Sequence, residues 1–253
     1  MKKKILFSTL MICASTALFP GAISAGNIPD GLSVKLRAGY SVGGTAPLDM
    51  PPAIRSIDSY NLTPSIMFGV DAECPIYRKW GLQTGLHIEN KGMGASITTK
   101  GYRMEMVQED SRIEGLFTGT VHQKVTSWML TLPVQATLNI NRISLKAGPY
   151  ASFVISGDFS GIASNGYLRQ GDPTGPKIII GNRNGEWATY DFSEHIRSFQ
   201  FGVNIGADYT INDNFGVSAD LNWGLTGFLK NSFKTVDRAL YPIYGTIGLF
   251  YRF

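Results

Sequence analysis

Hydrophobic and polar residues alternate in several stretches of this sequence. In "SFQFGVNIGADY" (198–209), apolar side chains occupy the odd positions from Phe199 to Tyr209, and polar residues or glycine occupy the even positions. Successive side chains of a β-strand point to opposite faces, so this period of two places the apolar residues on one face of a strand. The same pattern predicts eight strands. They cover residues 32–42, 65–76, 80–91, 127–140, 143–155, 198–209, 215–225 and 241–253.

The connections between these strands alternate in length. Three are tight and rich in turn-forming residues, at 77–79, 141–142 and 211–214. Four are long, at roughly 43–64, 92–126, 156–197 and 226–240. An up-and-down sheet of this kind has turns at one end and all its loops at the other, as outer-membrane barrels do. We therefore predict an all-β chain that forms a single up-and-down antiparallel transmembrane β-barrel with long extracellular loops.

The third long connection contains a possible extra hairpin. The stretch "KIIIGNRNGEWATY" (177–190) has strand-like ends and a turn sequence at Asn184-Gly185. This hairpin either stands above the barrel or adds two strands to it, so ten strands are the alternative to eight.

The two faces of the predicted strands differ in charge. The apolar face of all eight carries no Asp, Glu, Lys or Arg, and a lysine or arginine that faces lipid costs about 2–4 kcal/mol at the bilayer midplane. Aromatic residues on this face lie near strand ends, as is typical of membrane interfaces. They are Tyr40, Trp80, Trp128, Tyr209, Phe215, Trp223, Tyr241 and Phe253. A periplasmic, lipocalin-like binder with its apolar face inside remains an alternative.

The opposite face carries charges of both signs, which we expect to form a polar network inside the barrel. Antiparallel pairing places the cations of the first strand, Lys35 and Arg37, beside the acids of the second. It likewise places Lys146 opposite Asp208. Eight strands enclose just enough space for side chains, and buried charges must pair, so we predict a plugged interior and no open porin. The predicted network comprises Lys35, Arg37, Asp71, Glu73, His87, Glu89, Lys91, Lys146, Asp208, Asp220 and Arg252.

The first residues predict export. Three lysines at 2–4 precede an apolar run, and the small residues of "GAISAG" offer a cleavage site near Ser24 or Ala25. We therefore predict a signal peptide at 1–25 and a mature barrel domain at 26–253. The chain has 23 Lys and Arg against 19 Asp and Glu. Without the three leader lysines the mature charge is nearly balanced, so the composition does not indicate a nucleic-acid partner.

Catalytic chemistry has few candidates in this sequence. His87 lies near Glu89 on the inward face, and a base beside a carboxylate can perform acid–base catalysis. His195 follows Asp191 and Ser193, but neighbours in sequence seldom converge as a catalytic triad. The acids of "QED" (108–110) belong to a single loop segment. We expect no catalytic residue, cofactor or metal site. An outer-membrane lipid-modifying enzyme or protease is the alternative.

In their order and spacing, several motifs resemble the PorT-like outer-membrane β-barrel family. They include "KLRAGYSVGG" on the first strand, "LP" at 132–133, "KAGPY" at 146–150 and the terminal "GTIGLFYRF". The resemblance implies an outer-membrane barrel, and it carries over no catalytic or binding residue. It also implies that the barrel-assembly machinery reads the terminal aromatic residues, here Tyr251 and Phe253.

The expected function follows from these observations. We expect a monomeric barrel embedded in outer-membrane lipid, with a structural, binding or envelope-accessory role. Binding residues concentrate on loops that a rigid scaffold holds, so an extracellular protein or a glycan is the expected partner at the loops.

Overall fold

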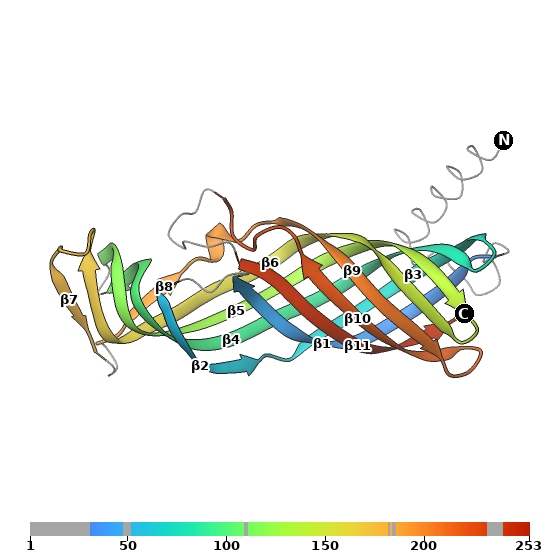
Figure 1. Cartoon of the computed structure of the whole chain (residues 1–253), viewed down its shortest axis with the longest axis horizontal. Helices are drawn as coiled ribbons and strands as arrows, with labels where there is room; N and C mark the ends of the chain where they lie inside the picture. Colours follow the sequence, from blue (N-terminus) through green and yellow to red (C-terminus); the bar gives the residue numbers. More distant parts are fainter. Residues whose placement is uncertain (1–30, 48–51, 109–110, 182, 184–185, 232–239) are drawn as a thin grey trace.

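The computed structural model describes residues 31–47, 52–108, 111–181, 183, 186–231 and 240–253 (Figure 1). The predicted leader and the predicted turn at 184–185 lie outside these residues. Within the described residues there are eleven strands and one short 3-10 helix, η2 (Ser193–His195). The strands are β1 (Ser33–Pro47), β2 (Ile54–Leu62), β3 (Ser65–Tyr77), β4 (Trp80–Gln108), β5 (Ser111–Ile140), β6 (Ile143–Gln170), β7 (Lys177–Ile180), β8 (Ala188–Asp191), β9 (Phe199–Thr210), β10 (Phe215–Gly224) and β11 (Leu240–Arg252).

Eight of these strands close into an antiparallel ring. Its order is β1, β3, β4, β5, β6, β9, β10 and β11, and β11 pairs with β1 from Arg252 opposite Lys35 to Leu240 opposite Pro47. The prediction of an eight-stranded barrel is therefore confirmed. β7 and β8 stay outside the ring, so the ten-strand alternative is wrong. Both pair with β6, and β8 also pairs with β4.

The apolar face of each barrel strand points outward. On β11 the outward Ile247 and Leu249 are 74% and 63% exposed, whereas the inward Tyr244 and Phe250 are each 2% exposed. A lipocalin-like barrel needs the reverse arrangement, so that alternative is wrong. Among the described residues, no helix is long and apolar enough to cross a membrane.

The predicted long loops differ most from the structure. β4, β5 and β6 are 29, 30 and 28 residues long and continue far beyond the barrel rim (Figure 1). β2 lies within the first predicted loop and pairs with β4. We call this extracellular extension the platform. It consists of residues 92–108 of β4, 111–127 of β5 and 156–170 of β6, together with β2, β7, β8 and the segment 192–197.

The platform has a hydrophobic core of its own. Its aromatic centre is Phe159, whose ring centroid lies 5.7 Å from that of Phe192 and 6.4 Å from those of Tyr190 and Phe228. Buried residues of β4, β5, β6, β7 and β8 surround these rings. They include Met93, Ile97, Met104, Met106, Phe117, Val121, Val125, Ala163, Leu168, Ile180 and Ala188. Burial of this many apolar side chains makes the platform a folded unit instead of a set of loops.

Two glycines allow the distal β4–β5 hairpin to bend. The pairing of β4 with β5 shifts register between Thr99 and Tyr102, where Gly101 has a φ of +66°. Gly119 of β5 has a φ of +153°, and a Cβ there would lie 2.6 Å from Cζ of Phe117. Beyond the bend, Val107 of β4 pairs with Thr189 of β8. The hairpin therefore closes over the platform core.

Replacement of Gly119 should disrupt the platform and spare the barrel. In Gly119→Val, the new side chain would clash with Phe117 and with the backbone of β6, in a conformation that L-residues seldom adopt. We expect proteinase K to cleave 111–127 in intact cells expressing the variant, while the barrel keeps its heat-modifiable migration on gels. Gly94→Ala is the control, because its Cβ would have ordinary contact at 3.6 Å. Equal protease resistance of both variants would contradict this account of the bend.

Candidate functional site

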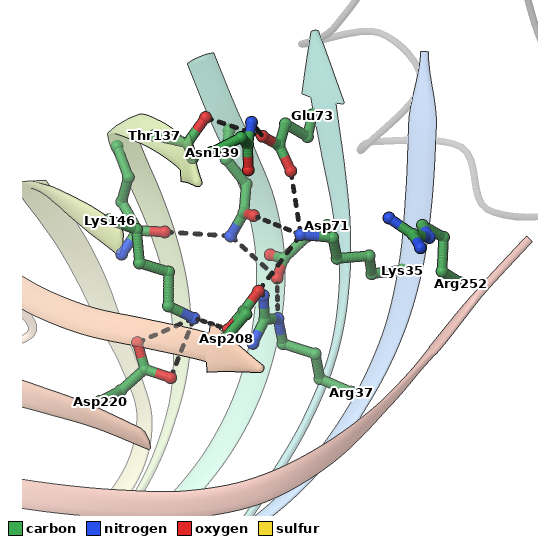
Figure 2. Close-up of polar contacts among 12 residues, drawn as sticks. Lys35, Arg37, Asp71, Glu73, Thr137, Asn139, Lys146, Asp208, Asp220 and Arg252 are labelled. Atoms are coloured by element: carbon green, nitrogen blue, oxygen red, sulfur yellow. Dashed lines mark hydrogen bonds and ion pairs between the residues drawn. The ribbon is translucent and has the colours of Figure 1, made fainter. Parts of the chain in front are cut away.

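Arg37 lies in the barrel interior and is 1% exposed. Its Nε donates to Asp71, and its Nη1 and Nη2 donate to the two carboxylate oxygens of Asp208 at 2.9 and 2.5 Å. The planar guanidinium matches the carboxylate of Asp208 in this two-point contact. Lys35, two residues away on the same face of β1, donates to Glu73 at 2.9 Å and to Asp208 at 3.2 Å. Figure 2 shows these contacts.

Lys146 of β6 extends the network to the opposite wall. Its Nζ lies 2.9 Å from Asp208 and 3.0 Å from Asp220 (Figure 2). Side-chain amides continue the chain of contacts, because Gln135 donates to Asn204 and Asn204 donates to Asn222 at 2.6 Å. Gln83 of β4 joins these amides to the charged residues, because it donates to Asp71 at 3.2 Å and to Gln135 at 3.1 Å. The network thus connects β1, β3, β4, β5, β6, β9 and β10 across the barrel.

A second layer lies nearer the extracellular end. Lys91 Nζ is 2.5 Å from Glu89 and lies over the rings of Tyr150 and Tyr244, at 5.8 and 5.5 Å from their centroids. His87 Nε2 lies 2.8 Å from Asp71 and connects the two layers. The cavity beside His87 and Glu89 measures only about 20 Å³, which is about the space of one water molecule. The side chains therefore fill this part of the interior.

Ten of the eleven predicted interior residues take part in these contacts, and Arg252 does not. Arg252 is the direct cross-strand neighbour of Lys35, and like charges in that position repel. Its Nε and Nη2 instead donate to the backbone oxygen of Asp213 in the periplasmic turn, at 3.2 and 3.0 Å. In Figure 2 it stands apart from the network. The prediction for Arg252 is wrong for this electrostatic reason.

The terminal aromatic residues are held in the barrel wall. The backbone N–H of Phe253 donates to the oxygen of Val34 at 3.1 Å. The ring of Tyr251 lies 4.9 Å from that of Phe215 and 5.0 Å from that of Phe253. The outward residues of β11 face lipid, which explains why this segment is rich in apolar side chains. Recognition of Tyr251 and Phe253 by the assembly machinery stays a prediction.

The candidate catalytic residues are engaged in structural contacts. His87 is enclosed in the barrel, where the cavity leaves no room for a substrate. Ser193 Oγ accepts the N–H of Phe159 at 3.0 Å, and Asp191 accepts the N–H of Ser193 at 2.9 Å. These contacts with Ser193 hold the pKa of Asp191 below its usual range. Of "QED", residues 109 and 110 lie outside the described residues. In the part of the chain described, no three His, Cys, Asp or Glu side chains are grouped to hold a metal ion.

Sequence reasoning missed a pocket of about 620 Å³ on the outer surface of the platform. It spans β5, β6 and β8, which are adjacent in the sheet. Its lining consists of His122, Gln123, Lys124, Ser160, Gly161, Ile162, Thr189, Tyr190 and Asp191. Tyr190 packs into the core behind the pocket, and burial there raises its pKa well above the usual value. The strands that form this pocket are distant in sequence, and no local motif marks it.

A closed eight-stranded ring with an apolar outer face and paired charges inside defines a transmembrane β-barrel of the outer membrane. Residues 24–230 match the family described as "Outer membrane protein beta-barrel domain", and the chain belongs to this family. No curated protein sequence matches the chain.

Several solved structures are similar to the chain at low sequence identity. Ail of Yersinia pestis, solved with the heparin analogue sucrose octasulfate, is 12% identical, covers 88% of this chain and 99% of its own, and has a TM-score of 0.39. OprG of Pseudomonas aeruginosa is 12% identical, covers 87% and 95%, and has a TM-score of 0.39. The outer membrane protease OmpT of Escherichia coli is 14% identical, covers 89% and 97%, and has a TM-score of 0.32.

Removal of the Lys146 charge tests the energetic role of the interior network. In Lys146→Met, Asp220 loses its cation and Asp208 loses one of three. Breaking a buried pair in this way should cost about 3–5 kcal/mol of unfolding free energy, measured by urea unfolding in detergent. Lys79→Met, at an exposed turn position, is the control and should cost far less. Equal stability of the two variants would show that the network does not stabilise the barrel.

Proposed function

We propose that this protein is a non-conducting, non-enzymatic barrel that holds a binding platform outside the cell. The barrel anchors the chain in the outer membrane, and the platform contacts an extracellular ligand or partner. The observation that carries this proposal is the contrast between a filled interior and a large folded extension above it.

The filled interior argues against transport. Large cations and carboxylates from six strands meet across the barrel, and the cavity beside them holds only about one water molecule. Ion passage would require these buried pairs to separate, which is costly in a low-dielectric environment.

The platform argues for binding. A barrel that served only as an anchor would need no second hydrophobic core, whereas a binding surface benefits from rigid support. β4, β5 and β6 run without interruption from the membrane into the platform. They therefore hold its surface at a fixed height and orientation.

Within its family, we propose that the chain is a PorT-like member. The motifs that support this lie together in the structure, since Pro133 of "LP" is paired with Tyr150 of "KAGPY". This placement leaves an accessory role in envelope secretion or assembly as the second candidate function. We further propose that residues 1–25 are removed on export, that the assembly machinery reads Tyr251 and Phe253, and that the mature protein is a monomer.

Two measurements test the proposed function. The purified protein in planar lipid bilayers should show no stepwise conductance. Cells that display the protein should adhere to at least one surface coated with mucin, fibronectin or lipopolysaccharide, and Gly119→Val should abolish that adhesion while the barrel stays folded. The matched control is Gly94→Ala, which should adhere as the unmodified protein does.

Either of two results would contradict the proposal. Regular conductance steps in the bilayer would show that the interior opens. Equal adhesion by the unmodified protein and Gly119→Val would show that the folded platform is not the binding element.

A further inference from the structure

The pocket on the platform lies on the same face as the lipid-contacting residues of the barrel. On β5, Lys124 and His122 have the same parity as Trp128, which is exposed at the rim of the apolar surface. Lys124 lies four residues beyond Trp128, about 13 Å along the strand. The pocket therefore faces outward, just above the level where the hydrocarbon of the membrane ends.

Cross-strand pairing brings the polar side chains of the pocket together in two rows. Lys124 is paired with Ser160, and Ser160 with Asp191. In the next row, His122 is paired with Ile162, and Ile162 with Thr189. Paired residues on one face have Cβ atoms about 5 Å apart. Each row of three residues therefore spans about 10 Å from its first to its last Cβ atom.

The groups in these rows have complementary hydrogen-bonding capacity. The ammonium of Lys124 only donates, the carboxylate of Asp191 only accepts, and the hydroxyl of Thr189 does both. Asp191 is fixed in place because its Oδ1 accepts the N–H of Ser193. Lys124 is exposed and lines the pocket, so its ammonium can reach a ligand there.

The lining favours a hydroxylated ligand over a protein segment. Protein anchors are usually aromatic or arginine side chains that fill deep pockets, but here the aromatic Tyr190 is buried in the platform core. Sugar hydroxyls both donate and accept, which suits mixed donors and acceptors. The half-buried Ile162, in the middle of the second row, can contact the C–H face of a sugar ring. A volume of about 620 Å³ lies within the usual range of small-molecule sites.

We propose that this pocket binds a short oligosaccharide of about two sugar residues, held between Lys124 and Asp191. The proposal rests on the proposed function, because it assigns the binding role of the platform to one site. Two kinds of molecule carry sugars of this chemistry. One is a glycolipid of the surrounding outer leaflet, whose headgroups lie at this height, and the other is a free glycan outside the cell.

The test measures binding to full-length purified protein in detergent by titration calorimetry. The probes are rough lipopolysaccharide, its delipidated core oligosaccharide, chitotetraose and a heparin tetrasaccharide. At least one should bind the unmodified protein. Lys124→Met and Asp191→Asn should each weaken that binding at least tenfold. Asp191→Asn retains the oxygen that accepts the N–H of Ser193, so the local fold is preserved. Thr126→Ala, on the same face but outside the pocket, should bind as the unmodified protein does.

The probes distinguish the two sources of sugar. Tighter binding of lipopolysaccharide and its delipidated core than of chitotetraose and the heparin tetrasaccharide would assign the pocket to membrane glycolipid. Tighter binding of chitotetraose or the heparin tetrasaccharide would assign it to a free glycan. Binding of intact lipopolysaccharide with no binding of its delipidated core would show that the pocket does not recognise the sugar.

The proposal is overturned if no probe binds, or if Lys124→Met and Asp191→Asn both bind as the unmodified protein does. This failure is distinguishable from failure of the proposed function. If Gly119→Val abolishes cell adhesion while Lys124→Met and Asp191→Asn leave it unchanged, the platform binds through another surface. If Gly119→Val also leaves adhesion unchanged, the platform is not the binding element.

Discussion

The pairing of buried charges around Arg37 is the constraint on which the rest of the structure depends. Lipid surrounds the barrel, so a charge on a membrane-spanning strand can be accommodated only inside, and there it must have a partner. Arg37 meets this requirement with Asp71 from the adjacent strand and Asp208 from β9 across the barrel. A shift of one residue in any strand would turn its charges toward lipid. The network therefore fixes strand register as well as closing the interior.

The same strands that satisfy this constraint also carry the platform. The outward face of β5 changes from Trp128, Leu130 and Leu132 in the membrane to Lys124 and His122 above it. The inward face changes in the opposite sense, from Thr131, Gln135 and Thr137 inside the barrel to Val121 and Val125 in the platform core. One continuous strand therefore faces lipid along its barrel segment and water along its platform segment. The change on its outward side marks the level of the membrane surface.

Much of the barrel could be predicted from its sequence, because lipid imposes a strong contrast between the two faces of each strand. The eight strands, their connectivity and the tight turns follow from that contrast. The same contrast identifies the charged residues of the interior network, except that Arg252 does not join it. Its direct opposition to Lys35 becomes apparent only when the register of β1 and β11 is known.

The platform could not be predicted in the same way. Above the membrane its outward residues face water, so serine, threonine and glycine replace the apolar residues that identify a membrane strand. Its bend depends on the backbone of Gly101 and Gly119, which the sequence does not distinguish from other glycines. The pocket requires β8 to pair with β6 across about 30 residues of chain. No local pattern encodes such a contact.

The long extracellular segments form a folded sheet that is continuous with the barrel. Hydrogen–deuterium exchange of the protein in native outer-membrane vesicles tests this claim most directly. If it is correct, the amides of residues 93–99, 119–127 and 156–163 exchange slowly, on the same timescale as the barrel strands. Complete exchange of these amides within seconds, while the barrel remains protected, would contradict it.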